Sequence, residues 1–440
     1  MTTISDNELL TRVGRGTPTG DLMREYWIPT CLSSELKSDA PPIRLMLLGE
    51  KLIAFRERSG RIGVMDHRCP HRCASLFFGR AEGDGIRCIY HGWKFDATGQ
   101  CVDQPNLPAD ERFVEKVHAV AYKVKEQGGL VWTYMGSRAE APPFPEIEAF
   151  DLPESEREIR VHQRKCNWLQ ALEGDIDTSH YSFLHMGSVK SEHVPPDTMH
   201  RFNLIERAPR YHVQDTEWGT MYAAWRPAEA DSLYYRFSHF MFPFYTLPPD
   251  GNFGDLVQVG IWVPMDDTHC MVFTIFWSKR TLGMRVLRDG NPIPGCVAPM
   301  DYLPDDGSWF GRWRLAAGPH NDYMIDRDSQ AADGIYSGIS GLATQDQAVT
   351  ESMGDIVDRS FEHLAPSDRM ITRTRRRLLM AVRAFKDEGV LPPGVDSPQY
   401  CQGARGGAFL APASQDWHQA YLENLDRIVR PLSTTRVAAE

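Results

Sequence analysis

Residues 167–185 read Asn167-Trp-Leu-Gln-Ala-Leu-Glu-Gly-Asp-Ile-Asp-Thr-Ser-His180-Tyr-Ser-Phe-Leu-His185, and they place two histidines and several carboxylates among apolar side chains. The apolar residues recur at a spacing that indicates a helix half buried in a core, and they are Trp168, Leu169, Leu172, Ile176, Phe183 and Leu184. Buried ionisable groups are normally neutralised or bound to a metal ion. Because two histidines and one carboxylate with open positions form the facial triad of non-haem Fe(II) oxygen chemistry, the stretch predicts such a site.

The separation of His180 and His185 predicts that this helix is distorted. Each residue of a regular α-helix turns by about 100°, so two side chains five positions apart diverge by about 140°. Both imidazoles can bind one ion only if the helix unwinds locally or carries a π-type bulge, whose natural step is from residue i to i+5.

Length and composition limit the protein class. The chain has 440 residues, more than the roughly 250–300 at which single cores stop growing, so two domains are expected. Its 42% hydrophobic and 24% charged residues describe an ordinary globular protein, and its net charge of −11 argues against a basic nucleic-acid binder. No apolar run approaches about eighteen residues, and the first residues lack the order of a signal peptide. We therefore expect a cytoplasmic protein without membrane or nucleic-acid partners.

Changes in composition along the chain predict four regions. Residues 1–25 form an N-terminal helical segment, in which the glycines at 14, 16 and 20 have the wrong spacing for a dinucleotide fingerprint and indicate a turn. Residues 26–135 contain short strand patterns separated by turn residues, which indicate a small all-β domain. Residues 136–155 are rich in Pro and Glu and form a linker, and residues 156–440 form the second domain.

The small β domain carries a second metal motif, Cys69-Pro-His71 followed by Cys88-Ile-Tyr-His91. A structural zinc finger pairs Cys with Cys and His with His, whereas each half of this motif supplies one of each. The mixed pairing is typical of a Rieske [2Fe–2S] centre, in which one iron takes both cysteines and the other both histidines.

The nine cysteines do not indicate a secreted disulfide framework. High-potential Rieske proteins bridge a Cys near position 73 to a second Cys, but the partner position here is Tyr90, so we expect Cys73 to be a packed free thiol. We interpret the remaining cysteines, which have no partners at ligand spacing, as structural: Cys31, Cys101, Cys166, Cys270, Cys296 and Cys401.

The second domain combines strands with flanking helices. Strand patterns at 211–218, 220–226, 233–242, 256–263 and 270–277 have lengths that suit an antiparallel sheet with hairpin links. Helical patterns return after Asp346, and 368–388 is a long amphipathic helix with a basic cluster at Arg373, Arg375, Arg376 and Arg377. The cluster is either a solvated helix face or a docking surface for an acidic redox partner.

With both motifs on one chain, the sequence resembles the α (oxygenase) component of Rieske non-haem iron aromatic-ring hydroxylases, most closely the phthalate 4,5-dioxygenase-like branch. The resemblance extends over nearly the whole length. It rests on Arg24-Glu-Tyr-Trp-Ile-Pro, the two Cys-x-His-type motifs, residues 167–185, Gln345-Asp346-Gln-Ala-Val-Thr-Glu-Ser-Met-Gly and Asp358-Arg-Ser-Phe-Glu-His-Leu. It implies an α+β protein, with an N-terminal all-β Rieske domain and a C-terminal helix-grip catalytic domain in which helices flank an antiparallel sheet.

The resemblance also implies roles for individual residues. His180 and His185 match the two histidine ligands of the mononuclear iron, and Asp346 is the best match for the third ligand, with Glu351 as the alternative. Asp177 matches a carboxylate that links a Rieske histidine of the neighbouring subunit to an iron histidine, here His91 to His180; its alternative is an ordinary helix carboxylate. Asn167 matches a residue near the iron, or is a helix-surface amide.

The implied activity is hydroxylation of an aromatic acid with O₂. Electrons must come from a separate NAD(P)H-dependent reductase, because the chain has neither a dinucleotide fingerprint nor a Cys-x4-Cys-x2-Cys ferredoxin run. The resemblance implies a ring-shaped homotrimer, sometimes stacked as a hexamer. We expect a dihydroxylating dioxygenase; the alternatives are a monooxygenase, such as an O-demethylase or ether-cleaving enzyme, and a Rieske electron carrier without catalysis.

Candidate substrate contacts are arginines. Arg236 lies among aromatic residues, where a buried guanidinium needs an anionic partner, either a substrate carboxylate or an internal salt bridge. Arg207 is the second candidate, and Arg210 and Arg226 are weaker ones. Branch membership suggests phthalates or substituted benzoates as substrates.

Overall fold

In the computed structural model, which describes residues 2–278 and 285–437, two short helices open the chain. Helix α1 (Ile4–Thr11) begins where the Thr3 hydroxyl accepts a hydrogen bond from the Asp6 amide. Helix α2 (Pro18–Arg24) begins at Thr17 with Pro at its first position, where a missing amide proton costs nothing. Both helices lie within the helical segment predicted at residues 1–25, and the predicted turn lies between them except for Gly20, which is part of α2.

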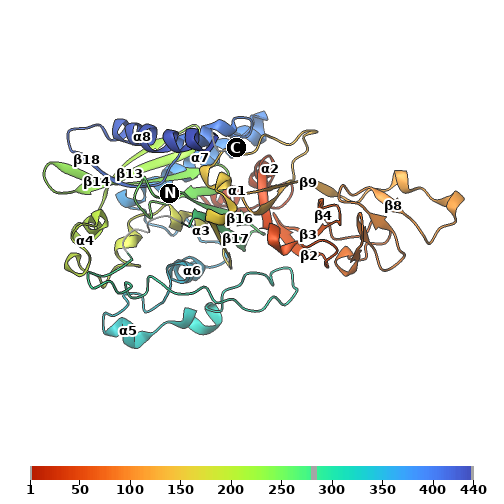
Figure 1. The fold of residues 1–440 in the computed structure, drawn as a ribbon, viewed down its shortest axis with the longest axis horizontal. Coiled ribbons are helices and arrows are strands. Elements are labelled where there is room, and N and C mark those ends of the chain that lie inside the picture. The colour runs from red at the N-terminus through yellow and green to blue at the C-terminus, as the bar shows by residue number, and fades with distance from the viewer. Residues whose placement is uncertain (1, 279–284, 438–440) are drawn as a thin grey trace.

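The N-terminal β region consists of two antiparallel sheets. The larger has the strand order β1-β10-β9-β4-β3-β2, and the smaller has the order β5-β6-β7-β8. The strands are β1 (Trp27–Leu32), β2 (Ile43–Leu47), β3 (Glu50–Arg56), β4 (Ile62–Asp66), β5 (Arg80–Ala81), β6 (Ile86–Arg87), β7 (Lys94–Phe95), β8 (Cys101–Asp103), β9 (Ala121–Gln127) and β10 (Leu130–Tyr134). Figure 1 shows the smaller sheet at the end of the molecule farthest from the second domain.

The second domain is built on an eight-stranded antiparallel sheet with the order β11-β17-β16-β15-β14-β13-β12, in which β18 also pairs with β14. The strands are β11 (Arg157–Arg164), β12 (Arg210–Asp215), β13 (Gly219–Pro227), β14 (Ser232–Met241), β15 (Tyr245–Leu247), β16 (Gln258–Pro264), β17 (Cys270–Trp277) and β18 (Gly407–Pro412). The prediction of an all-β domain followed by an antiparallel sheet with helices is confirmed.

The helices of the second domain lie on both sides of this sheet (Figure 1). They are α3 (Trp168–Asp175), α4 (Phe202–Ile205), α5 (Arg327–Ala331), α6 (Leu342–Ser352), α7 (Arg369–Glu388) and α8 (Trp417–Val437). One sheet face carries Phe237 and Phe409, which pack against Tyr421 and Leu425 of α8. The opposite face carries Arg236 and packs against α3. It is the functional face of the sheet.

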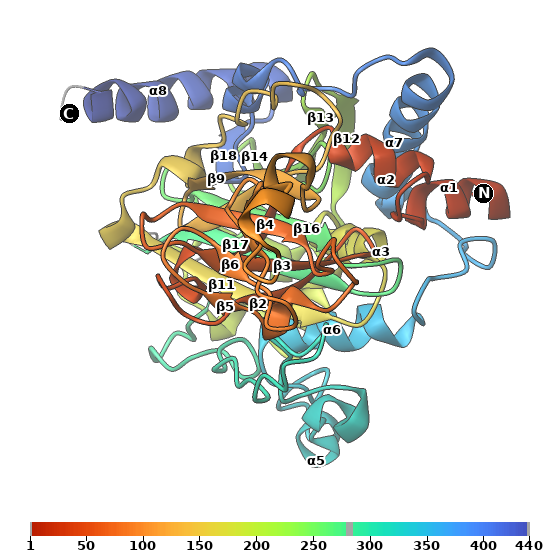
Figure 2. The ribbon, with the colours of Figure 1, turned by 90° about the vertical axis from the view of Figure 1, so that its right-hand side faces the viewer.

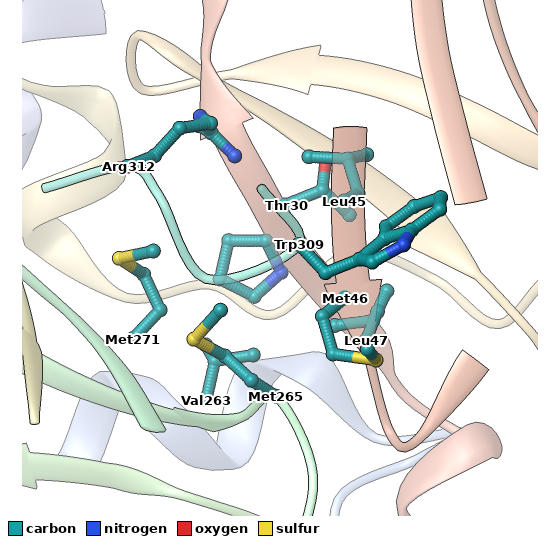
Figure 3. A pocket seen from close by; sticks show the side chains of 10 residues that line it. Thr30, Leu45, Met46, Leu47, Val263, Met265, Met271, Trp309 and Arg312 are labelled. Atoms are coloured by element: carbon teal, nitrogen blue, oxygen red, sulfur yellow. The ribbon is translucent and has the colours of Figure 1, made fainter. Parts of the chain in front are cut away.

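A loop of the second domain attaches the first domain to the sheet. In Figure 3, Trp309 and Arg312 of this loop lie against Leu45, Met46 and Leu47 of β2, opposite Val263, Met265 and Met271 of the second domain. Arg312 forms a salt bridge with Glu35, at 2.6 Å, and Trp309 packs edge-on against His67. Seen from the right-hand end, the strands of the first domain lie in front of the large sheet (Figure 2).

The structure decides how residues 167–185 are folded. Helix α3 ends at Asp175, with Ile176 as its C-cap, and the chain then forms a single 3₁₀ turn at His180–Ser182. The predicted local unwinding is confirmed, and the alternative of a π-type bulge is wrong. The helix at 369–388 is confirmed. Strands β11 and β18 and helix α8 were not predicted.

Candidate metal centres

Two loops of the smaller sheet present Cys69 and Cys88 with the same backbone hydrogen bonds. The amide of each cysteine donates to the carbonyl five residues later, at Ala74 and Trp93, both at 2.8 Å. Each cysteine carbonyl accepts from the amide four residues later, at Cys73 and Gly92, both at 2.9 Å. These last two residues have φ values of 59° and 80°, which let each loop reverse tightly. The motif's two halves therefore form a matched pair of loops.

The side chains of the two loops face one another. Cys69 and Cys88 are buried, and the rings of His71 and His91 lie 4.4 Å apart, with Trp93 stacked on His71 at 4.4 Å. The Nδ1 atom of His91 is buried and has no hydrogen-bond partner. Within the described part of the chain, only one set of three donor side chains, and not this one, gathers within 4.8 Å. The four donors therefore do not converge on a single zinc ion, whereas a two-iron cluster fits them.

The cysteines outside this set are free thiols. The expectation that Cys73 is packed is wrong, because its left-handed backbone at the loop tip turns the thiol outward and leaves it exposed. Five of the six cysteines interpreted as structural are buried, and Cys401 is partly buried.

The one set of donors that does converge is His180, His185 and Asp346. The Nε2 atoms of the two histidines are 3.1 Å apart, and the Asp346 Oδ1 atom lies 3.7 Å from that of His180 and 3.3 Å from that of His185. Ligands that bind one ion at about 2.1 Å on adjacent positions are about 3 Å apart, so these atoms fit one ion held on a single face. The unwound segment after α3 and the helix α6 bring the three together.

Each histidine is oriented by a different partner on its other ring nitrogen. The Nδ1 atom of His180 faces the Asp177 carboxylate at 3.6 Å. The Nδ1 atom of His185 lies 2.6 Å from the Oε1 atom of Gln345, whose own amide donates to the Ile339 and Gly295 carbonyls. Such partners fix the tautomer, so that Nε2 carries the lone pair for a metal. Sequence analysis missed Gln345, although it precedes Asp346.

The charges of the set favour a cation. Burial lowers the pKa of His180, but the interaction of its Nδ1–H with the Asp177 carboxylate and the charges of Asp346 and Asp177 outweigh it and raise this pKa to about 9. Burial alone raises the pKa of Asp346, yet the two histidines lower it to about 2. Without an ion, a proton on His180 balances the carboxylate; a divalent ion replaces that proton.

Two predicted site residues have structural roles instead. Asn167 is fully buried at the N-cap of α3, accepts a hydrogen bond from the Leu169 amide and donates to the Thr11 and Asp267 carbonyls. Because Asn167 is buried, the surface alternative is wrong. Its placement near the iron is wrong as well, because the whole of α3 lies between it and the segment of His180. Arg207 is not free for a substrate either.

The guanidinium of Arg207 donates to three backbone carbonyls of the histidine loop, those of Ser182, Gly187 and Val189. It fixes the loop that carries His185. The alternative third ligand, Glu351, accepts hydrogen bonds from the Lys165 amide and the Tyr323 hydroxyl and lies outside the set of converging donors.

Arg236 lies on the functional face of β14, beside the histidine loop. It is 2% exposed, and its guanidinium lies over the ring of Tyr181, 4.5 Å from the centroid. Its Nη2 donates to the Pro249 carbonyl, while Nε and Nη1 have no partner. No carboxylate of the described residues lies within 4.0 Å, so the structure holds no internal salt bridge for it.

Three of the four clustered arginines of α7 are occupied within the chain. Arg373 pairs with Asp215, Arg375 pairs with Glu173 and Glu362, and Arg377 donates to the Thr216 carbonyl. Arg376 is exposed. The cluster is mainly an internal scaffold, which leaves little of it for an acidic partner.

Comparison with known proteins agrees with these two centres. A family model described as "Rieske [2Fe-2S] domain" matches residues 26–127, and one described as "LigXa C-terminal domain like" matches residues 133–426. The 3-chlorobenzoate-3,4-dioxygenase oxygenase subunit of Comamonas testosteroni is 49% identical over 98% of this chain and 100% of its own length. The chain belongs to the Rieske non-haem iron oxygenases.

Other members of the Rieske oxygenases are also similar. The phthalate 4,5-dioxygenase oxygenase subunit of Pseudomonas putida is 36% identical over 88% of this chain and 87% of its own. The 5,5'-dehydrodivanillate O-demethylase oxygenase subunit of Sphingobium sp. (strain NBRC 103272 / SYK-6) is 43% identical over 86% and 80%. The structure of dicamba monooxygenase bound to dicamba shares the fold, with a TM-score of 0.55 and 17% identity over 83% of this chain and 99% of that chain.

Membership gives the protein its cofactors. The Rieske oxygenase carries one [2Fe–2S] cluster and one mononuclear iron, and it is the oxygenase component of a multicomponent enzyme. No helix of the described residues is long and apolar enough to cross a membrane.

Proposed function

We propose that this Rieske oxygenase dihydroxylates an aromatic acid, with O₂ and with electrons from a separate NAD(P)H-dependent reductase. The observation that carries the substrate class is Arg236, a buried guanidinium with two unpartnered nitrogens beside the iron triad. An unpaired buried charge is costly, and a carboxylate on the substrate removes that cost while it orients the ring. The names of the 3-chlorobenzoate and phthalate relatives support the same class.

The geometry supports the following ligand roles. Cys69, His71, Cys88 and His91 would hold the cluster, and His180, His185 and Asp346 would hold the iron on one face. The iron, when bound, supplies the open positions at which O₂ is reduced. Asp177 and Gln345 keep Nδ1–H on each imidazole, Arg207 holds the loop, and Arg236 places the acid.

We further propose that the chains form a homotrimeric ring, singly or stacked as a hexamer. In it the cluster of one subunit supplies the iron of the next through His91, Asp177 and His180. Asp177 supports this role, because one carboxylate oxygen faces His180 while the other accepts only from Ser179 of its own turn. A carboxylate between two ligand imidazoles would couple the two centres.

The test is product analysis with ¹⁸O₂, wild-type oxygenase, a generic flavin and iron–sulfur reductase and a panel of benzoates. We expect one product that contains two labelled atoms, formed with stoichiometric NADH consumption. NADH consumption that yields only peroxide would show that none of the acids in the panel is a substrate.

A second candidate is monooxygenation, such as O-demethylation. The O-demethylase relative, 43% identical, favours it, because the same iron site supports both outcomes. A methoxybenzoate in the panel separates the two: O-demethylation releases formaldehyde and puts one labelled atom at most into the aromatic product.

A further inference from the structure

A buried tryptophan lies flat against one of the two Rieske histidines. The indole of Trp93 stacks on the imidazole of His71, with ring centroids 4.4 Å apart and an angle of 8° between the planes. This separation is at the short end of the range for aromatic pairs, about 4.5–7 Å. Trp93 is 5% exposed, so it closes one face of the His71 ring to water.

The segment that follows β8 holds this indole in place. The Trp93 Nε1 atom donates a hydrogen bond to the Asn106 Oδ1 atom at 2.7 Å, and the Phe113 ring meets the indole edge-on, at 5.7 Å and 82°. Phe113 is itself fixed, because its amide donates to the Oε1 atom of the buried Gln104 at 2.8 Å. A hydrogen bond and a ring contact therefore fix the plane of Trp93, and through it the plane of His71.

The same segment packs closely on the second metal loop. Gly92, which lies between His91 and Trp93, has a φ of 80°, and a Cβ atom on it would be 2.6 Å from the Cγ atom of Pro105. A side chain at position 92 would therefore displace Pro105, the neighbour of Asn106. The metal loop and the segment that carries Asn106 form one packed unit.

The other Rieske histidine has a different ring neighbour. The Tyr90 and His91 rings have centroids 3.9 Å apart, but their planes are tilted by 39° and Tyr90 is 54% exposed. The two imidazoles therefore differ, because a fixed, buried ring covers that of His71 and a surface ring lies on that of His91.

Charge determines which redox state of the cluster the indole favours. Two ferric ions, two sulfides, two thiolates and two neutral imidazoles sum to zero, and one added electron leaves a net negative charge. The face of an aromatic ring is electronegative, and an apolar cover excludes the water that would solvate the added charge. Because both effects destabilise the reduced cluster, the indole lowers its reduction potential and makes the cluster a stronger electron donor.

We infer that Trp93, held by Asn106, is a positioning residue for electron transfer that fixes the His71 imidazole and lowers the reduction potential of the Rieske cluster. The inference rests on the proposed function in one respect, the assignment of His71 as a cluster ligand. It goes beyond that assignment, because the four ligands alone give no reason for a stacked indole or for its hydrogen bond to Asn106.

Redox titration of the intact holoenzyme tests the inference without substrate. The midpoint potential, followed by visible absorption, and the EPR spectrum of the reduced cluster are compared in wild type, Trp93→Leu, Trp93→Phe and Asn106→Leu. Gln100→Leu is the matched control, because the Gln100 amide also bonds within this region, to the Cys101 and Val114 carbonyls, but not to Trp93. Iron content per chain shows whether each variant holds its cluster.

For Trp93→Leu we expect a higher midpoint potential, by about three- to tenfold in the equilibrium with a one-electron donor, or about 30–60 mV. Its EPR g values should also change, because the plane of the imidazole is no longer fixed. Trp93→Phe should restore most of the wild-type potential, since a ring still covers His71, and Asn106→Leu should raise the potential by a smaller amount. Gln100→Leu should lower Tm and leave the potential unchanged.

A wild-type potential in Trp93→Leu with a full cluster overturns the inference. An equal shift in Gln100→Leu also overturns it, because the effect would then come from loosening the domain. If Trp93→Leu does not hold a cluster, Asn106→Leu decides, and a wild-type potential in that variant overturns the inference. Failure of the ligand assignment has a different signature, since His71→Ala would then keep a full cluster.

Discussion

At the scale of single residues, the two iron histidines differ in basicity because their Nδ1 atoms have different partners. His180 faces a carboxylate and His185 faces a neutral amide, so the first imidazole is the more basic ligand. Gln345 also adjoins Asp346 in the chain, so one turn of α6 supplies a ligand and the partner of another ligand. Removing that amide should loosen His185 without altering net charge.

For Gln345→Leu we expect affinity for Fe(II) to fall about 10- to 100-fold, the usual effect of losing an outer-shell partner. Titration of iron-depleted protein with Fe(II) measures it, and the visible Rieske spectrum should not change. Gln347→Leu is the control, because Gln347 is buried on the same helix but bonds to Glu351. Equal affinities in both variants would contradict the role of Gln345.

Asp175 gives a prediction about pH. Burial raises its pKa to about 7 from an ordinary value of 3.8, while the Thr246 hydroxyl hydrogen-bonds to it. The folded protein thus binds a proton more tightly than the unfolded chain. The contribution of Asp175 to the free energy of unfolding is therefore fully present below about pH 4, and it is lost between about pH 4 and 7 by up to about 1.4 kcal/mol per pH unit.

Asp175→Asn removes this titration while keeping a hydrogen-bonding side chain. Calorimetric Tm values from pH 5 to 8 should show wild type losing stability relative to the variant up to pH 7, after which the difference becomes constant. A difference that does not vary with pH would show that Asp175 is ionised throughout.

Residue types alone predicted which donors occur in the two metal motifs, because few side chains bind iron or its clusters. The roles predicted for Asn167 and Arg207 were wrong. The partners of Asn167 are the carbonyls of Thr11, 156 residues before it, and of Asp267, 100 residues after it, and only the folded chain brings them together. A local sequence pattern does not reveal a polar side chain whose hydrogen-bond partners are backbone groups far away in the chain.

At the scale of elements, the end of α3 determines the iron site. Local periodicity predicted the helix and the need for distortion, and the five strands with clear alternation were also predicted. Strand β18 pairs with β14 across about 170 residues, so nothing local marks it. Glu173 of α3 forms salt bridges with the buried arginines Arg359 and Arg375, and these fix the position of the helix.

We expect Arg375→Met to lower Tm markedly, because it leaves Glu173 and Glu362 with fewer partners in a buried network. Breaking a buried pair typically costs about 3–5 kcal/mol. Arg373→Met, which removes the solvent-accessible pair with Asp215 on the same helix, should cost at most about 1 kcal/mol. Calorimetry of both variants is the measurement; equal Tm values would mean that the network does not stabilise α3.

At the scale of the whole molecule, the Rieske loops belong to the domain at one end of the molecule, and the iron triad belongs to the other domain (Figure 1). The sequence predicted both centres but not their placement, which depends on the loop of Trp309 and Arg312 that fixes one domain on the other. The route proposed above runs between subunits and makes two predictions.

Asp177→Asn tests the proposed link. The amide keeps the turn with Ser179, so both centres should load normally, but reoxidation of the reduced cluster in a single turnover should slow by at least about tenfold, since the charge that couples the imidazoles is lost. Stopped-flow absorption measures the rate. Asp358→Asn, an exposed turn aspartate, is the control, and a wild-type rate in Asp177→Asn would rule out the link.

The route between subunits is decided by mixing two inactive chains. His71→Ala lacks the cluster and His180→Ala lacks the iron, and neither should turn over alone. In a cyclic assembly formed by co-expression at equal levels, half the chains hold iron and half of their neighbours hold a cluster, so about a quarter of wild-type activity should return. Wild type with His71→Ala should give about half by either route. No activity in the mixed assembly would place electron transfer within one chain and remove the role proposed for Asp177.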